Sequence, residues 1–353
     1  MYTKPPYTIT EKAADYLAKI VENITRLEFG TSFKRDIKLH RENRLRTIYS
    51  SLAIEGNTLT LSEVSAVIEG RLVAGTQTEI KEVKNAYEAY DKILNFAPYA
   101  VSDFLKAHKL MTDGLVKESG AFRSGDVGVF DGSKAIHIGA RPQFVPGLIA
   151  ELFEWAKDST LHPVLKSAIV HYEIETIHPF ADGNGRMGRL WQTLLLAKWN
   201  SIFAWIPMES VLYQNRPQYY QAIEAARKAN DSGVFIEFTL SAVFAIITTQ
   251  EEHQEKHQKK HQEKHQVKHQ VKHQVNLSDI QIAVLKLLEN KTLSRKAIFA
   301  AIERNSDSRS FKRHIEPLLM NGLIEMTVPD KPNSRIQKYR LTDNGRTFSR
   351  KDN

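Results

Sequence analysis

The chain has 353 residues, of which 42% are hydrophobic and 25% charged, so it is long enough for two or three ordinary globular domains. It has no cysteine, which excludes disulfides, thiolate catalysis and thiolate metal sites. Its net charge of +8 lies wholly after residue 250, because residues 1–250 hold 28 basic and 28 acidic side chains. The start lacks the apolar core of a signal peptide, and no uninterrupted apolar run reaches 18 residues. We therefore expect a cytoplasmic protein with no membrane span.

Apolar residues recur at helical spacing through most of the first 250 residues. This spacing predicts helices over residues 11–29, 34–55, 62 onward, 80–96, 102–117, 146–155, 163–177, 186–199, 217–229 and 234–249. Ser102 is expected to cap its helix. The sequence therefore predicts a body that is mainly α-helical.

The period changes to two near residue 127. Val127-Gly128-Val129 and a second short run that includes Ile136 flank Asp131-Gly132, which is a hairpin turn signal. A lone two-stranded hairpin is marginally stable unless it packs on something. We therefore expect a flap that covers a site on the helical body.

Residues 253–274 are of low complexity, with His-Gln recurring every four residues. Histidines at that spacing share one helical stripe, so a divalent metal could bridge them. Because no acidic partner accompanies the stripe, we expect instead a solvated helical or disordered linker over residues 251–275.

The last segment, residues 276–353, holds 15 basic and 9 acidic residues. Its pattern predicts helices over 278–289, 294–304 and 308–321 and strands over 323–328 and 336–341, which is a winged helix-turn-helix arrangement. Basic residues follow the third helix and the loop between the strands; they are Arg309, Lys312, Arg313, Lys331, Arg335 and Lys338. Two interpretations stay open, namely DNA binding through residues 276–353 and docking to a protein.

The segment from His178 to Arg189, HPFADGNGRMGR, carries the clearest chemical signal. It contains G-x-G-x-x-G, but a helical pattern precedes it where a dinucleotide-binding fold requires a strand. Glycines ahead of a helix favour phosphate binding by backbone N–H groups. Arg186 and Arg189 lie three apart on the first turn and can both reach phosphate oxygens. Asp182 is a natural Mg²⁺ ligand, and His178 can act as a general base.

With these residues the chain resembles the Fic family, whose motif H-P-F-x-(D/E)-G-N-G-R-x-x-R it meets at every fixed position. The resemblance implies a Fic helical fold with a β-hairpin flap at Val127, Gly128, Val129 and Ile136. It also implies transfer of AMP from ATP to a Ser, Thr or Tyr hydroxyl of a target protein. His178 would deprotonate the hydroxyl and Asp182 would hold Mg²⁺. The nucleotide-binding residues would be Gly183, Asn184, Gly185, Arg186, Met187, Gly188, Arg189 and Tyr219, although core packing is an equal alternative for Tyr219.

A second pattern of the same family lies upstream. Ser51-Leu52-Ala53-Ile54-Glu55-Gly56 fits (S/T)-x-x-x-E-(G/N), which marks an inhibitory helix in proteins that this chain resembles. The resemblance implies that Glu55 pairs with Arg189 and occupies the place of the γ-phosphate. The alternative is an exposed glutamate at a helix C-terminus, where the helix dipole disfavours it.

We therefore expect an N-terminal helical region with the inhibitory helix (1–100), a Fic catalytic core (101–250), the linker (251–275) and the winged-helix domain (276–353). Two other functions stay open. One is a hydrolase that removes AMP from a modified protein at the same site, and the other is a nucleotide-sensing DNA-binding regulator. Other Fic proteins use other nucleotide or phosphocholine donors, and a homodimer is also left open.

Overall fold

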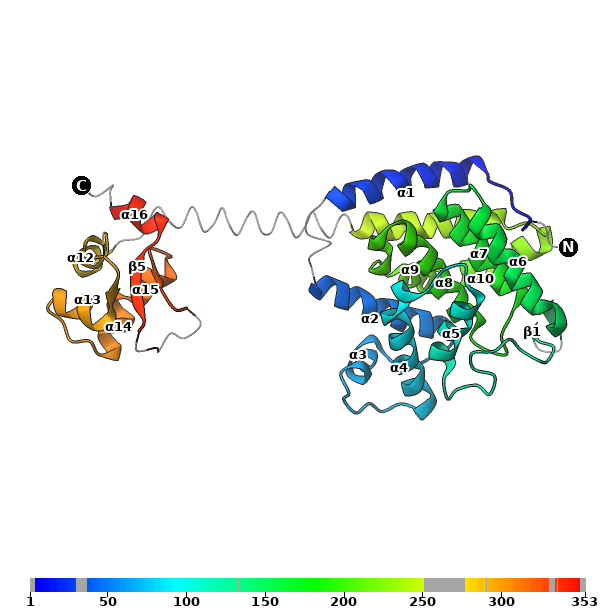
Figure 1. Ribbon diagram of the computed structural model, residues 1–353, viewed down its shortest axis with the longest axis horizontal. Helices are drawn as coiled ribbons and strands as arrows, with labels where there is room; N and C mark the ends of the chain where they lie inside the picture. The colour runs from blue at the N-terminus through cyan, green and yellow to red at the C-terminus, as the bar shows by residue number, and fades with distance from the viewer. Residues whose placement is uncertain are drawn as a thin grey trace. The chain divides into compact units, whose positions relative to one another are not determined.

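The computed structural model describes residues 4–29, 37–131, 134–250, 277–289, 291–329, 334 and 336–349. The chain divides into two compact units, Met1–His257 and Gln258–Asn353. Helices dominate the first unit, and the second combines short helices with a small sheet (Figure 1). The His-Gln repeat lies outside the described residues.

The first unit holds the helices that were expected and a few that were not. Its elements in chain order are α1 (Glu11–Phe29), α2 (Ile37–Ile54), α3 (Leu61–Ile68), α4 (Gln77–Asp91), η2 (Ile93–Asn95), α5 (Val101–Thr112), β1 (Gly128–Asp131), β2 (Lys134–Ile138), η3 (Pro142–Phe144), α6 (Val145–Asp158), α7 (Pro163–Ile177), α8 (Asn184–Trp199), η4 (Ser201–Ala204), α9 (Met208–Gln214) and α10 (Arg216–Ala229). A further helix covers Gly233–Gln250.

The start of α5 differs from the expectation. Ser102 lies inside the helix, and the N-cap position belongs to Ala100, whose side chain makes no capping bond. The carboxylate of Asp103 accepts the backbone N–H of Ala97 instead, at 2.9 Å. The predicted cap is therefore wrong, because the longer carboxylate side chain one residue on satisfies a donor ahead of the helix.

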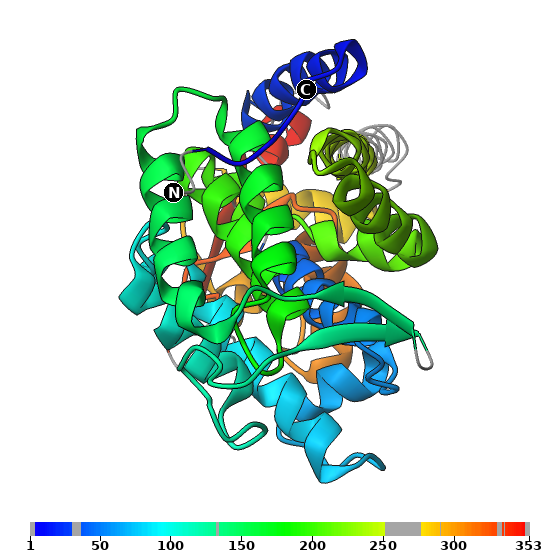
Figure 2. The same ribbon diagram turned by 90° about the vertical axis from the view of Figure 1, so that its right-hand side faces the viewer.

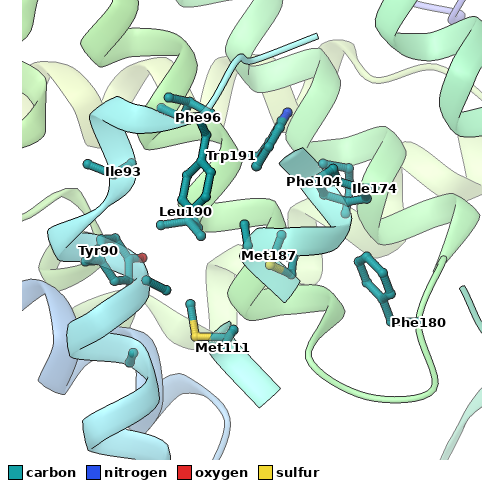
Figure 3. Packing of buried hydrophobic residues seen from close by; sticks show 14 of the residues in the cluster. Tyr90, Ile93, Phe96, Phe104, Met111, Ile174, Phe180, Met187, Leu190 and Trp191 are labelled. Carbon is teal, nitrogen blue, oxygen red and sulfur yellow. The ribbon is translucent and has the colours of Figure 1, made fainter. Parts of the chain in front are cut away.

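Helices α7 and α8 form the centre of the first unit and pack along each other. Phe104 of α5, Ile174 of α7 and Trp191 of α8 belong to one buried cluster, which also holds Phe180 from the loop between α7 and α8 (Figure 3). Because Phe180 is fully buried in this cluster, the loop that carries the motif is anchored to the core.

A second cluster lies where α1 runs beside the helix Gly233–Gln250 (Figures 1 and 2). By length and composition alone, that helix is the one among the described residues that could cross a membrane. Its side chains Leu240, Val243 and Ile247 are buried against α1 and α7, and 56% of the helix is buried inside the structure. It therefore serves as a core helix here.

Strands β1 and β2 pair antiparallel as a hairpin, with Gly128 opposite Ile138 and Val129 opposite His137 (Figure 2). The register shifts between Val129 and Phe130. The N–H of Gly139 donates to the carbonyl of Val127 at 3.0 Å and closes the base of the hairpin.

In the described part of the second unit, four short helices precede the last two strands, and one more helix follows them. Its elements are α12 (Asp279–Leu287), β3 (Leu293–Ser294), α13 (Arg295–Ala301), α14 (Ser308–His314), α15 (Glu316–Met320), β4 (Ile324–Met326), β5 (Lys338–Leu341) and α16 (Asp343–Ser349). The strands form an antiparallel sheet in the order β3-β5-β4 around a core that includes Phe299 and Leu318.

The third helix of this unit was expected as one piece over 308–321 but is divided into α14 and α15. Pro317 lies in the first turn of α15 and has no N–H to donate to the carbonyl of Arg313, four residues earlier, so the helical hydrogen bonding is interrupted there. The basic residues that were expected in the loop between β4 and β5, Lys331 and Arg335, lie outside the described residues.

Candidate active site

His178 follows α7 as its C-cap in the left-handed region, with φ 53° and ψ 61°. Few residues other than glycine adopt this conformation, and it turns the chain sharply away from the helix. The His178 N–H donates to the carbonyl of Ile174 at 3.0 Å, and its own carbonyl accepts the Nε of Arg123 at 2.7 Å. Bonds on both sides of His178 therefore hold the residue that we expect to be the base.

The loop after His178 is braced by its own residues. The amide of Asn184 accepts the Phe180 N–H at 2.8 Å and donates to the Phe180 carbonyl at 2.9 Å. Asn184 is buried, so its side chain is occupied by the loop and is not directed to a ligand in this state. The resemblance implies that Asn184 binds the phosphates; in the structure its hydrogen bonds shape the loop that precedes α8.

Asp182 and Arg186 lie together at the start of α8. One carboxylate oxygen of Asp182 accepts the Gly183 N–H at 2.6 Å and the other accepts Nη2 of Arg186 at 2.8 Å. The Nη1 of Arg186 also lies 3.4 Å from Oε1 of Glu82 on α4. The side chain of Asp182 is 58% exposed, so its carboxylate is accessible from solvent.

Asp182 fits the expected Mg²⁺ as its one protein carboxylate. Among the residues that the structure describes, no group of three or more His, Cys, Asp or Glu side chains could hold a metal ion. Mg²⁺ is commonly bound by one or two carboxylates, with substrate phosphates and water completing its ligands. A single exposed carboxylate beside a phosphate-binding loop therefore suits Mg²⁺ that arrives with a nucleotide.

Arg189 is buried and binds the end of α2. Its Nε donates to Oγ of Ser51 at 3.2 Å, and its Nη2 donates to the Ser51 carbonyl at 3.0 Å and to Oε1 of Glu55 at 2.6 Å. Burial lowers the pKa of Arg189, but the nearby carboxylate of Glu55 outweighs this and leaves the pKa above its usual range. The sequence pattern that contains Ser51 and Glu55 is thus in direct contact with the motif.

Glu55 also lies against the backbone at the start of α8. A Cβ added at Gly185 would overlap Oε1 of Glu55 and would lie 3.0 Å from Nη1 of Arg189. The N-terminus of a helix attracts anions through its free N–H groups and its dipole. The Glu55 carboxylate therefore occupies the end of α8 where the sequence predicts a phosphate.

Three residues expected at the nucleotide face the interior. Met187 is fully buried in the core cluster, and Gly188 lies against His171, whose Cδ2 would be 2.6 Å from an added Cβ. Tyr219 is 1% exposed, and its hydroxyl bonds to Glu175 at 3.2 Å and to His171 at 3.0 Å. Met187 and Gly188 lie on faces of α8 that pack inside the first unit, and Tyr219 lies where α10 packs on α7, so these residues pack as core here.

The hairpin residues lie at the edge of this site. Val127 is half-buried, and Gly128, Val129 and Ile136 are in the paired strands, whose side chains lie outside the described residues. At the base of the hairpin, an added Cβ at Gly139 would lie 3.4 Å from Cβ of His178. The end of the hairpin that joins the helical body therefore lies next to His178, the expected general base.

Two residues of the site carry no sequence signal. His108 stacks on Phe180, with 3.6 Å between ring centroids, accepts the Gly120 N–H on Nδ1 at 3.0 Å, and has Nε2 3.0 Å from the Asp182 carbonyl. Burial lowers the pKa of His108 to about 4, so it is neutral at pH 7. Arg123 is the other residue. Neither residue forms a sequence motif with its partners, because these include backbone groups distant in the sequence, at Asp182 and His178.

Comparison with known proteins places this geometry in a family. Residues 98–196 match the model of the Fic/DOC family, and residues 280–342 match the model described as "Filamentation induced by cAMP protein Fic-like, C-terminal domain". The solved structure of a Fic family protein from Desulfovibrio desulfuricans G20 is 38% identical, with a TM-score of 0.70, over 96% of this chain and 98% of that one.

Curated relatives carry the name protein adenylyltransferase Fic. The protein from Nematostella vectensis is 32% identical over 217 residues, and the one from Drosophila melanogaster is 30% identical over 208 residues. These matches cover 58% and 56% of this chain but only 47% and 40% of the relatives, so the chain spans less than half of their length. The matches to the family model and to the full length of the bacterial structure agree with the motif at residues 178–189: the chain belongs to the Fic family.

Proposed function

We propose that this chain is a protein adenylyltransferase that transfers AMP from ATP to a hydroxyl side chain of a target protein and is inhibited by its own Glu55. The observation that carries the proposal is the arrangement at the start of α8. His178, Asp182 and the glycine-flanked helix end lie on one short loop, and Arg189 behind them is paired with Glu55.

The reaction follows from the roles these residues can take. His178 would accept the proton of the target hydroxyl, whose oxygen then attacks the α-phosphorus of ATP, and pyrophosphate departs. Arg186 and Arg189 would bind phosphate oxygens, and the N–H groups at the start of α8 would add donors to them. Asp182 would hold Mg²⁺, which neutralises phosphate charge when bound. Most of the rate would come from positioning and electrostatic stabilisation.

Inhibition follows from the position of Glu55. Its carboxylate accepts a hydrogen bond from Nη2 of Arg189 and contacts Gly185. A phosphate bound at Arg189 and Gly185 would therefore meet the negative charge of Glu55. Like charges in a half-buried site repel strongly. ATP would therefore bind productively only after Glu55 has moved, and the wild-type chain would be nearly inactive.

The test is incubation of the full chain with α-labelled ATP, alone and with a lysate. Glu55→Gly is expected to raise labelling by at least about tenfold over wild type, since a lost charge clash of this kind exceeds 1.4 kcal/mol. His178→Ala added to it should abolish labelling but keep ATP binding. Glu69→Gly is a matched control, because Glu69 also follows a helix and pairs with arginines, Arg41 and Arg71, away from the motif.

The same assay separates the other functions. If wild type removes label from protein that the Glu55→Gly variant has modified, the site is a hydrolase. If ATP binds but no label is transferred or removed by either protein, the chain is a nucleotide-sensing regulator. Labelled GTP, CTP and UTP in parallel identify the donor.

We also propose that the second unit, with Arg309, Lys312 and Arg313 exposed on α14, binds DNA in a winged-helix manner. Exposed basic side chains on one helix can contact phosphates along a groove. Glu replacements at these three positions should abolish a salt-dependent shift of duplex DNA by the full chain. Arg346→Glu on α16 is the control. A wild-type chain that shifts no duplex even at low salt would leave protein docking as the role of this unit.

Location and assembly complete the proposal. We propose a cytoplasmic location, and the burial of the helix Gly233–Gln250 in the core supports a role for that helix inside the fold and not as a membrane span. Fractionation of cells would test it. Sedimentation at several concentrations would decide between a monomer and the homodimer that the sequence leaves open.

A further inference from the structure

Arg123 lies between α5 and β1 and binds only backbone carbonyls. Its Nε donates to the carbonyl of His178 at 2.7 Å and its Nη1 to that of Gly125 at 2.8 Å. Its Nη2 donates to the carbonyl of Ala140, with the carbonyl of Ile177 at 3.5 Å. All three nitrogens of the guanidinium are therefore engaged, and the residue is 3% exposed.

This arrangement is energetically unusual. Burial lowers the pKa of Arg123, and the one charged group that raises it is Asp126, three residues along the chain. A buried charge is destabilising unless hydrogen bonds compensate for lost water, and here neutral carbonyls supply that compensation. Arginine suits this role because its planar fork presents several donors at once, which lysine does not.

The carbonyls come from three segments that are separate in the sequence. Gly125 precedes the hairpin, Ala140 follows it, and His178 is the expected base. The backbone N–H of Arg123 adds a further link, to the carbonyl of Pro179 at 3.1 Å. The position of Gly139 has no room for a side chain, because an added Cβ would lie 2.9 Å from Nη2 of Arg123.

From this geometry we propose that Arg123 is a positioning residue, which holds His178 in its left-handed conformation and fixes the base of the hairpin relative to it. The inference rests on the proposed AMP transfer at His178. In the described part of the chain, β1 and β2 pair only with each other, so an extended target segment can add to the hairpin. A target segment paired with the hairpin keeps its hydroxyl at a constant distance from His178 only if the hairpin does not move relative to His178.

The expected defect is in turnover and not in ATP binding. None of the four hydrogen bonds of the Arg123 side chain goes to the start of α8 or to Arg189. A small misplacement of a base can lower a rate by about a hundredfold. Loss of Arg123 should therefore lower kcat for label transfer and leave the KM for ATP nearly unchanged.

The test compares Arg123→Lys with its parent in the full-length Glu55→Gly protein. We expect kcat to fall by about tenfold or more and the KM for ATP to change by less than about twofold. In Arg123→Ala, guanidinium ion at tens of millimolar, well below denaturing concentrations, should restore part of the turnover. Arg44→Lys is the control, because Arg44 is half-buried and also donates to a backbone carbonyl, that of Tyr90, but contacts neither His178 nor the hairpin in the hydrogen bonds of the described residues.

Hydrogen exchange gives a readout that does not depend on activity. Peptides that cover residues 124–140 and 177–184 should exchange faster in Arg123→Lys, whereas those that cover α10 should not change. A kcat equal to that of the parent, or unchanged exchange in both segments, overturns the inference. If the parent transfers no label from any donor, the proposed function fails, and the exchange result alone decides whether Arg123 holds the two segments.

Discussion

Oε1 of Glu55 lies 2.6 Å from Nη2 of Arg189, and the same oxygen lies directly against Gly185, one turn earlier on α8. A single carboxylate thus contacts both the cation and the backbone at the helix start. The side chain of Glu55 is 35% exposed and that of Arg189 is 1% exposed. Because Arg189 is enclosed by the core, Glu55 is the member of the pair with room to move.

Gly185→Ala should therefore be coupled to Glu55. In wild type, the added methyl overlaps the carboxylate and should destabilise the fold by about 1–3 kcal/mol. In Glu55→Gly the obstacle is gone, and the same substitution should lose most of that effect. Urea unfolding of the four proteins gives the coupling free energy.

Gly147→Ala on α6 is the control for this cycle, because no atom lies within 4 Å of its added Cβ. Alanine in that helix should be neutral or stabilising with either residue at position 55. Equal destabilisation by Gly185→Ala in both backgrounds would mean that Glu55 does not rest on Gly185 in solution.

Ser51→Ala should release inhibition in part. The substitution removes the hydroxyl that accepts Nε of Arg189, at 3.2 Å, but leaves the Ser51 carbonyl and Glu55 in place. Loss of one such bond to a buried charge is worth about 1.5–3 kcal/mol. Labelling from ATP should rise above wild type and stay below that of Glu55→Gly. Ser50→Ala is the neighbouring control, since its hydroxyl bonds Ser210 and not Arg189; equal labelling by the two variants would contradict the role of Ser51.

Much of this site could be predicted from sequence because it is local. The expected helix 163–177 matches α7 at both ends, and the helix after the glycines begins within two residues of the expectation. Glycines, acidic and basic residues within twelve positions must lie close together whatever the rest of the fold does. The contact of Glu55 with Arg189 spans 134 positions and could be expected only through the resemblance to a family.

The remainder depends on tertiary packing that no spacing encodes. Arg123 binds carbonyls, which every residue possesses, so no pattern of side chains marks its partners. Tyr219 faces the core because α10 packs on α7, and Asn184 turns back on the loop because the Phe180 backbone groups need partners. The break at Ile315 could have been expected from the sequence, since a proline has no N–H for the helical hydrogen bond to the carbonyl four residues earlier.

Removal of Mg²⁺ should stop label transfer by the Glu55→Gly protein, and Asp182→Asn in that protein should weaken the binding of Mg²⁺. The amide keeps an acceptor for Arg186 but loses the charge that holds a hard cation. We expect the Mg²⁺ concentration for half-maximal labelling to rise by about tenfold or more. Asp113→Asn is the control, because Asp113 is exposed and pairs with Lys81. Identical Mg²⁺ dependence of both variants would exclude Asp182 as the ligand.

His171 should make the stability of the first unit fall on acidification. Its Nδ1 lies 2.7 Å from Oε1 of Gln192 and its Nε2 lies 3.0 Å from the Tyr219 hydroxyl. Burial lowers the pKa of His171 from 6.5 to about 3. The unfolded chain therefore binds a proton below pH 6.5 that the folded chain refuses, so the contribution of His171 is complete above pH 6.5 and is lost as the pH falls toward 3.

The measurement is the free energy of unfolding in urea at pH 7, 6 and 5 for wild type and His171→Asn. One pKa unit is worth about 1.4 kcal/mol, so the advantage of wild type should shrink by about 2 kcal/mol between pH 6.5 and pH 5. Burial and the nearby Glu55 raise the pKa of Glu175, which gives a slope of opposite sign, but Glu175 is present in both proteins and its effect largely cancels in the difference. Parallel stability curves for the two proteins from pH 7 to pH 5 would show that the buried imidazole does not set this dependence.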